Sequence, residues 1–205
     1  MNSGATSDRV YDALKHRILT RSCRPGDRLE PAALAEALGS SATPVRDALH
    51  LLTGERLIET RPGGGFYVPQ IDEPALEDLY AWVAQLLLIA LSKPPKGAMR
   101  SAPDEPGGST DAARATADLF ERIADQSGNL EHACAIRSTS DRLHAARLVE
   151  AGLFDDWRDE LAQVETAFIA GDMRALRRRL AAYHRRRRRV AATIVRALYR
   201  PDPNG

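Results

Sequence analysis

The spacing of apolar residues predicts three helices in the first part of the chain. Apolar residues recur at every third or fourth position over 7–20, which predicts a helix with Ser7 as its N-cap. Two shorter helices are expected at 31–39 and 43–55, because each has a proline in its first turn. Thr43 is the expected N-cap of the third helix.

A β-hairpin is expected to follow these helices. Residues 56–70 alternate between apolar and polar positions on both sides of a glycine-rich segment, which places the turn at 61–65. Three helices, a tight turn between the second and third, and a two-stranded wing make up a winged helix-turn-helix. The pattern therefore predicts a DNA-binding domain over residues 1–70.

The rest of the chain has a helical pattern, apart from one segment. Residues 75–92 are apolar around most of the helix circumference, so this helix should be buried on several sides. Further helices are expected at 111–126, 129–150, 155–170 and 172–199. Segment 93–110 has four prolines and three glycines, and we expect a disordered loop there. The predicted fold is mainly α, with the winged helix-turn-helix at 1–70, a linker at 71–74 and an antiparallel α-helical bundle at 75–205.

The composition is typical of a protein of the reducing cytosol. The two cysteines, Cys23 and Cys134, have no spacing that suggests a disulfide scaffold or a metal site. The N-terminus lacks the basic and apolar regions of a signal peptide, and the longest apolar run, 82–91, is too short to cross a bilayer. We therefore expect a cytoplasmic protein with no membrane partner.

The net charge of +1 conceals an uneven distribution. Residues 1–73 carry nine basic and ten acidic side chains, residues 74–173 carry nine and seventeen, and residues 174–205 carry eleven and one. Eight arginines lie within residues 177–190 alone. This basic run can neutralise acidic residues of the same fold, segment 155–160 among them, or those of a second subunit. Its alternative role is to hold a nucleic-acid backbone without sequence preference.

The stretches VYDALKHRIL (10–19) and RPGDRLEPAALAEALGSSATPVRDALHLLTGERLIETRPGGGFYV (24–68) carry a family pattern. They resemble the DNA-binding domain of the GntR superfamily of bacterial transcription regulators. The resemblance implies a dimer on a palindromic operator, with the third helix in the major groove and the wing tip near the minor groove or the backbone. The DNA-contacting residues that it implies are Ser41, Thr43, Pro44, Arg46, Arg61, Gly63 and Gly64.

Physical arguments agree with part of this assignment. The free amide groups of a helix N-terminus suit a phosphate, and an arginine on its first turn suits a guanine edge. The glycines beside Arg61 are expected to allow a close approach of the backbone. Alternatively, Arg46 is a surface arginine paired with Asp47 or Glu55. Ala32 and Ala42 stand where the family often carries arginine, so we expect modest operator affinity.

The C-terminal part resembles the all-helical effector domain, called FCD, of the FadR-like branch. The stretches that carry this resemblance are LEDLYAW (76–82), LFERIADQSGN (119–129) and FIAGDMRALRRRLAAYH (168–184). Many such domains hold a divalent metal with one acid and three histidines, but the matching positions here are Ala117, Glu121, Leu161 and Tyr183. We therefore expect that the metal site is lost and that no cofactor is bound. A rearranged site built from Asp118, Glu121 and His184 is the alternative.

The pocket positions implied by the same resemblance are Trp82, Val83, Glu121, Leu161 and Tyr183, joined by Arg187. Their character favours a small apolar, aromatic or cationic effector over a citrate-like anion. The other reading is that the interior is filled and binds nothing. The histidines expected at the surface are His132, His144 and His184.

Arg187 falls on the apolar stripe of the last predicted helix, so it should face inward. A buried guanidinium needs a partner, for which we expect Glu121 or Asp118, or else a ligand carboxylate. The other arginines of the run should face mostly outward.

The expected function is a sequence-specific, DNA-binding transcription regulator that acts as a homodimer. Repression is the expected mode, with a small-molecule effector where the interior binds one. The alternative is a non-enzymatic architectural or ligand-independent protein that binds nucleic acid through its arginine-rich last helix. No nucleophile motif, phosphate-binding loop or paired acid and histidine supports an enzyme. The helix over 75–92 and the last helix are the expected dimer interface.

Overall fold

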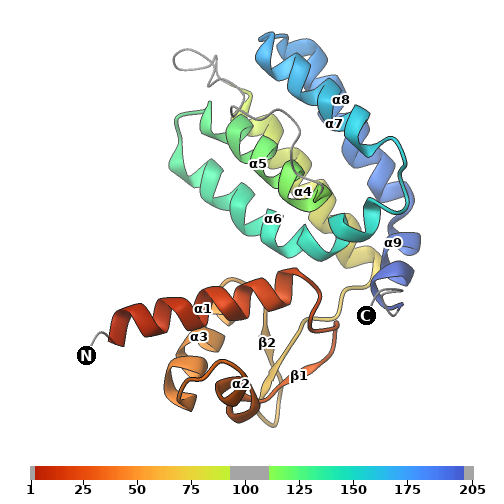
Figure 1. Ribbon diagram of the computed structural model, residues 1–205. Helices are drawn as coiled ribbons and strands as arrows, with labels where there is room; N and C mark the ends of the chain where they lie inside the picture. The colour runs from red at the N-terminus through yellow and green to blue at the C-terminus, as the bar shows by residue number, and fades with distance from the viewer. Residues whose placement is uncertain (1–2, 93–110, 201–205) are drawn as a thin grey trace. The chain divides into compact units, whose positions relative to one another are not determined.

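The computed structural model describes residues 3–92 and 111–200 (Figure 1). The chain divides into two compact units, Met1–Ile71 and Asp72–Gly205. The loop expected over 93–110 lies outside the described residues.

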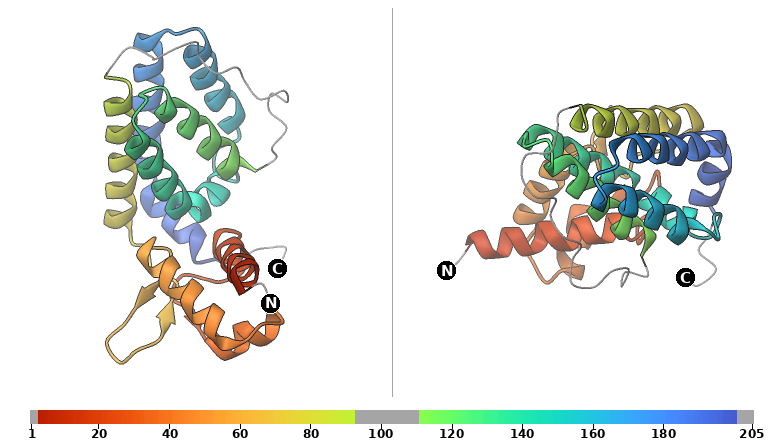
Figure 2. Two further views of the ribbon diagram at one scale, coloured as in Figure 1. Left: turned by 90° about the vertical axis from the view of Figure 1, so that its left-hand side faces the viewer. Right: turned by 90° about the horizontal axis from the view of Figure 1, so that it is seen from above.

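The first unit has three helices and a small antiparallel sheet. Its helices are α1 (Ser3–Leu19), α2 (Pro31–Ala37) and α3 (Ala42–Gly54), and its strands are β1 (Arg28–Leu29), β2 (Glu59–Thr60) and β3 (Phe66–Tyr67). The strand order is β1-β3-β2, so the predicted hairpin of β2 and β3 gains a third strand from the segment before α2. Figure 2 shows this hairpin as an extended wing. The predicted winged helix-turn-helix is confirmed.

Two helix starts in the first unit differ from the prediction, and in the second unit α4 (Glu73–Ala90) begins inside the predicted linker 71–74. The first helix begins at Ser3 and passes through Ser7, because no residue before Ser7 stops it. The third helix begins at Ala42, so its N-cap is Ser41 and not Thr43. Proline is tolerated in the first turn of a helix, where its missing amide hydrogen is not needed, so Pro44 fits this earlier start.

One apolar core holds the first unit together. It joins side chains of the three helices to those of the wing, and its largest fully buried members are Leu49, Leu52 and Ile58. Burial of each such side chain stabilises the fold by roughly 1.5–3 kcal/mol. This core fixes the angle between α3 and the wing.

The second unit is all-helical among its described residues (Figures 1 and 2). Its helices are α4 (Glu73–Ala90), α5 (Ala112–Asp125), α6 (Leu130–Glu150), α7 (Trp157–Ile169), α8 (Met173–Arg189) and α9 (Ala191–Leu198). Four of them start at a side chain that accepts a hydrogen bond from a first-turn amide, namely Asp72, Asp111, Asn129 and Asp172. Helix α5 packs against α6, and α8 packs against both α4 and α7.

The last helix is interrupted, contrary to the single helix predicted over 172–199. Val190 has φ −119° and ψ 17°, outside the helical region, and ends α8. Its amide donates to the carbonyl of Arg187, three residues back (3.1 Å). A β-branched residue fits such a bend better than the interior of a helix. Helix α9 restarts at Ala191, and its residues Ile194 and Leu198 are buried.

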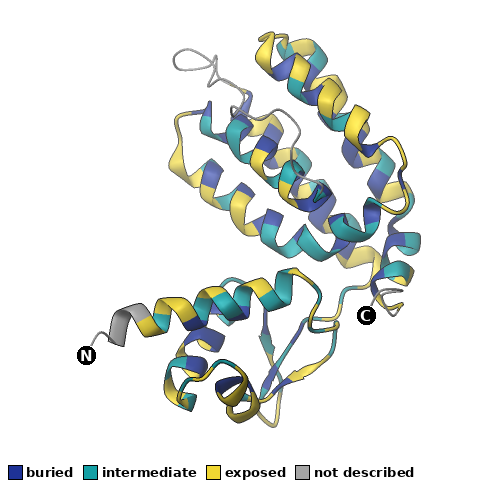
Figure 3. Ribbon diagram, in the orientation of Figure 1, coloured by how far each residue is buried: buried dark blue, intermediate teal, exposed yellow. Residues whose placement is uncertain are grey.

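Helix α4 is buried along one face, on residues spaced three and four apart, and not on several sides as predicted (Figure 3). Its buried residues are Leu76, Leu79, Tyr80, Val83, Leu86, Leu87 and Ala90. Three large apolar side chains nevertheless remain exposed on it, namely Trp82 (46%), Leu88 (39%) and Ile89 (49%). Within the described ranges, no helix combines the length and apolar character needed to cross a membrane.

Candidate functional site

Helix α3 presents one polar face to solvent. The exposed residues of this face follow helical spacing and are Thr43, Arg46, Asp47, His50, Leu51 and Gly54. The opposite face packs into the core through Val45, Ala48, Leu49 and Leu52. The sequence thus forms a helix with one face packed into the core and the opposite face exposed. A DNA-recognition helix needs this arrangement, because its exposed face contacts the DNA.

Arg46 makes no hydrogen bond or ion pair with any other described residue. The Glu55 carboxylate, one of its expected alternative partners, instead accepts from Lys15 Nζ at 3.0 Å and from the Tyr11 hydroxyl. The guanidinium of Arg46 is therefore available to a ligand outside the chain.

The start of α3 leaves its first amide groups without a side-chain cap. Ser41 is extended (φ −87°, ψ 164°) and exposed, and its side chain makes no capping hydrogen bond. Pro44 supplies no amide hydrogen, but the other first-turn amides carry the positive end of the helix dipole. This end of the helix can accept a phosphate oxygen.

The wing carries Arg61 in a defined position. Its guanidinium lies over the Tyr67 ring, with Cζ 4.2 Å from the centroid, and Nε donates to Glu59 Oε1 at 2.9 Å. Tyr67 and Glu59 are cross-strand partners, so the hairpin register sets the position of Arg61. Its charge is already partly compensated, and binding to a phosphate has to compete with Glu59.

The glycines at the wing tip are needed for their backbone conformation. Gly63 and Gly64 have φ +97° and +86°, where other residues are strained. A Cβ atom at either position would meet no atom within 4 Å, so crowding inside the chain does not require glycine there. The open space around both residues leaves the tip accessible.

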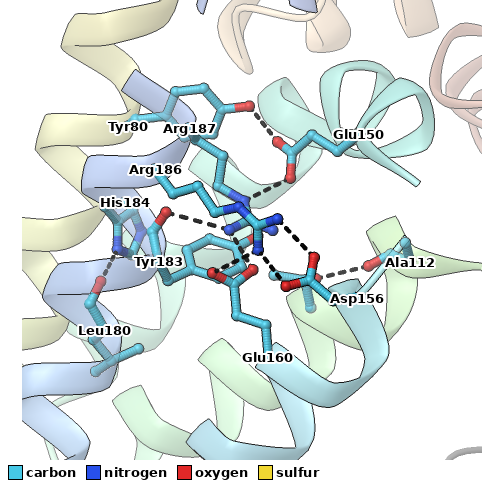
Figure 4. A network of polar contacts seen from close by, with 11 residues as sticks. Tyr80, Ala112, Glu150, Asp156, Glu160, Leu180, Tyr183, His184, Arg186 and Arg187 are labelled. Carbon is cyan, nitrogen blue, oxygen red and sulfur yellow. Dashed lines mark hydrogen bonds and ion pairs between the residues drawn. The ribbon is translucent and has the colours of Figure 1, made fainter. Parts of the chain in front are cut away.

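Arg187 is buried in the second unit, as its place on the apolar stripe predicts; its exposed fraction is 2%. Its Nε donates to Glu150 Oε2 at 2.7 Å, and its Nη1 donates to Glu160 Oε2 at 2.5 Å (Figure 4). Cζ lies 3.4 Å from the centroid of the Tyr183 ring. The Tyr80 hydroxyl donates to the other oxygen of Glu150. Burial alone would lower the pKa of Arg187, but Tyr183 and the two carboxylates raise it above its ordinary value.

The expected partners of Arg187 were wrong. The Glu121 carboxylate accepts a hydrogen bond from Arg137 of α6, and Asp118 is exposed. Helix α8 packs against α7, which supplies Glu160, and the end of α6 supplies Glu150. The hydrophobic pattern of α8 alone could not identify these partners, because they depend on how the bundle is packed.

The outward arginines divide into two groups. Arg186 binds Asp156 through two hydrogen bonds of 2.9 and 2.6 Å and stacks on Phe154, which confirms the expected contact with segment 155–160. The other arginines of α8 that are exposed and form no ion pair with another described residue are Arg174, Arg177, Arg178, Arg179, Arg185, Arg188 and Arg189. Of these, Arg177 donates a hydrogen bond to the Leu91 carbonyl at 2.5 Å.

The expected pocket residues do not form one lining. Trp82 is exposed, which contradicts its assignment to the interior, while Val83 and Tyr183 are buried in the core. Leu161 is half-buried and packs on a separate small cluster of Ala112, Phe154 and Trp157. Of the six residues, the structure brings Tyr183 and Arg187 into direct contact.

Two buried polar residues were missed. His184 was expected at the surface but is 2% exposed, and its Nδ1 donates to the Leu180 carbonyl at 2.8 Å. Burial lowers its pKa to about 3, with Arg147 and Arg187 adding to the effect, so the ring is neutral. Arg147 is 1% exposed. The signal was present in the sequence, because residues 133, 136, 140, 143, 147 and 150 repeat with steps of three and four along α6.

The residues present do not fit the divalent metal of the resembling domains. Among the residues that the structure describes, no three metal-ligating side chains lie together. Glu121 is bound to Arg137, and Asp118 is exposed. His184 has two arginines, Arg147 and Arg187, as electrostatic neighbours, and their charge opposes a cation.

Known proteins resemble both units. Residues 6–68 match the model of the bacterial regulatory proteins, gntR family. The HTH-type transcriptional regulator McbR of Escherichia coli K12 is 35% identical over 83 residues, which cover 40% of this chain and 38% of that protein. The Nta operon transcriptional regulator of Aminobacter aminovorans is 40% identical over 57 residues, covering 28% of this chain and 27% of that protein. The matched segments thus span less than two fifths of these relatives.

Solved structures resemble the fold over nearly the whole chain. E. coli McbR/YncC superposes with a TM-score of 0.65 at 20% identity, over 95% of this chain and 98% of that one. A crystal structure of a GntR regulator, described as putative, from Rhodococcus sp. RHA1 gives a TM-score of 0.70 at 20% identity, over 96% and 100%. The fold of a helix-turn-helix unit followed by a helical unit is therefore shared. Residues 6–68 of this chain form a winged helix-turn-helix domain of the gntR family of bacterial regulatory proteins.

Proposed function

We propose that the protein is a sequence-specific, DNA-binding transcription regulator. The observation that carries this proposal is the exposed face of α3 within a gntR-family domain, with Arg46 unpaired on the first turn of a helix that has no side-chain cap. The relatives named above are transcriptional regulators, and this supports the same class for the present chain.

Helix α3 enters the major groove with its N-terminal end toward the bases. Arg46 donates two hydrogen bonds to a guanine, and the first-turn amides with Ser41 and Thr43 hold a phosphate. The wing reaches the adjacent backbone or minor groove through Arg61. Because residues 1–73 carry nine basic and ten acidic side chains, non-specific attraction is weak and most affinity comes from directed contacts.

A homodimer on a palindromic operator is the proposed assembly. Trp82 and Ile89 are seven residues apart, two turns on the same face of α4, and Leu88 adds to this exposed apolar surface. Apolar side chains of this size tend to mark an interface. A symmetric pair of reading helices requires half-sites about one helical turn of DNA apart, or a multiple of that spacing.

The proposed mode of action is repression in the cytoplasm, without enzymatic activity. A repressor of this kind occupies its operator until a change in the second unit alters the distance between the two reading helices. We propose that a small molecule with an apolar or aromatic body causes this change, because the buried side chains of the second unit are mostly apolar and aromatic.

One observation favours a second candidate function. The seven exposed arginines of α8 that lack an ion pair could hold a nucleic-acid backbone without sequence preference. Such a protein would bind all duplexes about equally. It would also lose affinity steeply as the salt concentration rises.

Selection from a library of randomised DNA duplexes tests the proposal. The full-length protein should enrich an inverted repeat, and the enriched duplex should outcompete a scrambled duplex by at least about 1,000-fold at physiological salt. Enrichment of no motif, with equal competition by both duplexes, would support the second candidate function instead.

A further inference from the structure

The exposed face of α3 carries a histidine one helical turn beyond Arg46. His50 lies seven residues after Thr43 and four after Arg46, so the three side chains share one face of the helix. Residues spaced three, four and seven positions apart on a recognition helix can all reach base edges in a major groove. Gly54, one turn further on the same face, is exposed and has no side chain that would shield His50. The position of His50 is therefore open to a duplex that Arg46 contacts.

The ring of His50 is held in a defined direction by the wing. It packs edge-on against Phe66, with the ring centroids 5.0 Å apart and an angle of 76° between the ring planes. Phe66 is 8% exposed and belongs to β3, the strand that pairs with both β1 and β2. Aromatic pairs favour this edge-to-face geometry. A buried residue of the wing thus restricts the direction of an exposed side chain of α3.

The contact with Phe66 leaves the polar atoms of His50 unused. The side chain forms no hydrogen bond or ion pair with another described residue. An imidazole ring offers at least one N–H donor in either protonation state. His16 of α1 is also exposed, but it makes no ring contact with a described residue. His50 thus combines a fixed ring with a donor that has no acceptor in the described part of the chain.

The chemistry of this donor selects the base. Guanine presents two acceptors in the major groove, N7 and O6, and no donor. Adenine presents one acceptor beside an amino group, thymine presents one acceptor beside a methyl group, and cytosine presents only an amino group. A side chain that offers an N–H group in a fixed direction therefore favours guanine.

We propose that His50 reads a guanine in each half-site, at a base pair other than the one contacted by Arg46, and that Phe66 is the positioning residue that directs its ring. This inference rests on the proposed regulator function and adds a second base contact to it. It also gives the wing a second role. Besides approaching the DNA through Arg61, the wing affects sequence preference from within the domain, through the contact between Phe66 and His50.

Competition binding by the full-length protein on a panel of duplexes tests the role of His50. The panel contains the duplex selected by the wild type and every single-base-pair substitution of its half-site, made symmetrically in both half-sites. His50→Ala should lose about 10-fold discrimination at one guanine and keep the preference at the other positions, including the one lost in Arg46→Ala. His16→Ala makes the same change at an exposed histidine of α1 and should keep the whole profile.

Two further variants separate base reading from a structural role. Glutamine pairs with N6 and N7 of adenine, so His50→Gln should move the preference at that base pair from guanine to adenine. A residue that only supports the fold would give no new preference. The glutamine variant also carries the test if His50→Ala does not fold.

Phe66→Leu keeps an apolar side chain in the core but removes the ring that holds His50. It should relax the preference at the base pair of His50 and keep the preference at that of Arg46. Circular dichroism confirms that each variant has the helical content of the wild type. Full preference at both base pairs in Phe66→Leu would remove the positioning role of Phe66.

Three results would overturn the role of His50. The first is an unchanged profile in His50→Ala. The second is equal weakening on every duplex of the panel, which would make His50 a backbone contact. The third is a glutamine variant that still prefers guanine. On a panel where Arg46→Ala loses its base pair, each of these results overturns this inference alone, whereas a wild type that selects no motif overturns the regulator proposal as well.

Discussion

Arg187 Nε lies 2.7 Å from Glu150 Oε2, and both side chains are almost completely buried. This pair joins α8 to the end of α6, and Glu160 ties the same guanidinium to α7. One arginine of the basic run is thus part of the internal structure of the helical unit. A sequence dense in arginine does not by itself indicate a nucleic-acid surface.

The buried ion pair predicts a large loss of stability when its cation is removed. Arg187→Met leaves the Glu150 carboxylate buried with only the Tyr80 hydroxyl, so the free energy of unfolding should fall by about 3 kcal/mol. Urea denaturation measures this change. Arg188→Met, at the exposed neighbouring position, is the matched control and should stay within about 0.5 kcal/mol of the wild type. Equal effects of the two variants would contradict the role given to Arg187.

The buried imidazole of His184 predicts a specific dependence of stability on pH. Its pKa falls from 6.5 in the unfolded chain to about 3 in the fold, because burial disfavours the charged ring. Its contribution is fully present above pH 6.5 and is lost as the pH falls, since only the unfolded state then takes up the proton. The free energy of unfolding of the wild type, relative to His184→Phe, should decrease by about 1.4 kcal/mol per pH unit between pH 6 and 4. Parallel curves for the two proteins would mean that His184 is protonated in the fold.

The exposed apolar side chains of α4 predict how the dimer forms. Replacing Trp82 and Ile89 with serine should convert a dimer to a monomer in light scattering, without loss of helical content by circular dichroism. Leu130→Ser changes another exposed leucine, outside α4, and should leave the dimer intact. A double variant that remains fully dimeric at micromolar concentration would exclude this face as the interface.

The ion pair at the wing predicts a change in the salt dependence of DNA binding. Glu59→Gln removes the ion-pair partner of Arg61, so DNA affinity should rise. The slope of log affinity against log salt concentration should become more negative by about one, because one more counterion is released on binding. Arg61→Ala should weaken binding to all duplexes about equally and should not make the salt dependence steeper. Fluorescence anisotropy titrations between about 50 and 200 mM salt measure the affinity and its salt dependence for both variants. An unchanged affinity in both variants would remove Arg61 from the interface.

Local sequence signals were sufficient for much of the fold. Some residues determine only the local backbone, so their effect can be predicted from the sequence. Examples are Pro31 at the start of α2 and the two glycines of the wing tip, which have φ +97° and +86°. The inward direction of Arg187 was equally readable, because the α8 stripe is periodic. The break at Val190 could not be predicted from the sequence, because no glycine or proline marks it and the packing of α9 determines it.

The partners of the buried charges depend on contacts between distant segments. Glu150 and Arg187 are 37 residues apart, and no local pattern pairs them. Arg147 and His184 could have been placed inside by the same periodicity argument that placed Arg187. The direction of a side chain follows from local spacing, but the identity of its partner requires the three-dimensional arrangement.

The central claim is that α3 recognises the operator through Arg46, and competition binding on the selected duplex tests it most directly. The experiment compares Arg46→Ala with a triple variant in which Arg185, Arg188 and Arg189 become serine. We predict that Arg46→Ala loses about 10- to 100-fold in affinity and relaxes the preference at one base pair of each half-site, because a bidentate contact to guanine is lost. The triple variant should bind like the wild type. The opposite result would be an Arg46→Ala protein that binds with full affinity and a triple variant that no longer binds. It would contradict recognition through α3 and assign nucleic-acid binding to α8.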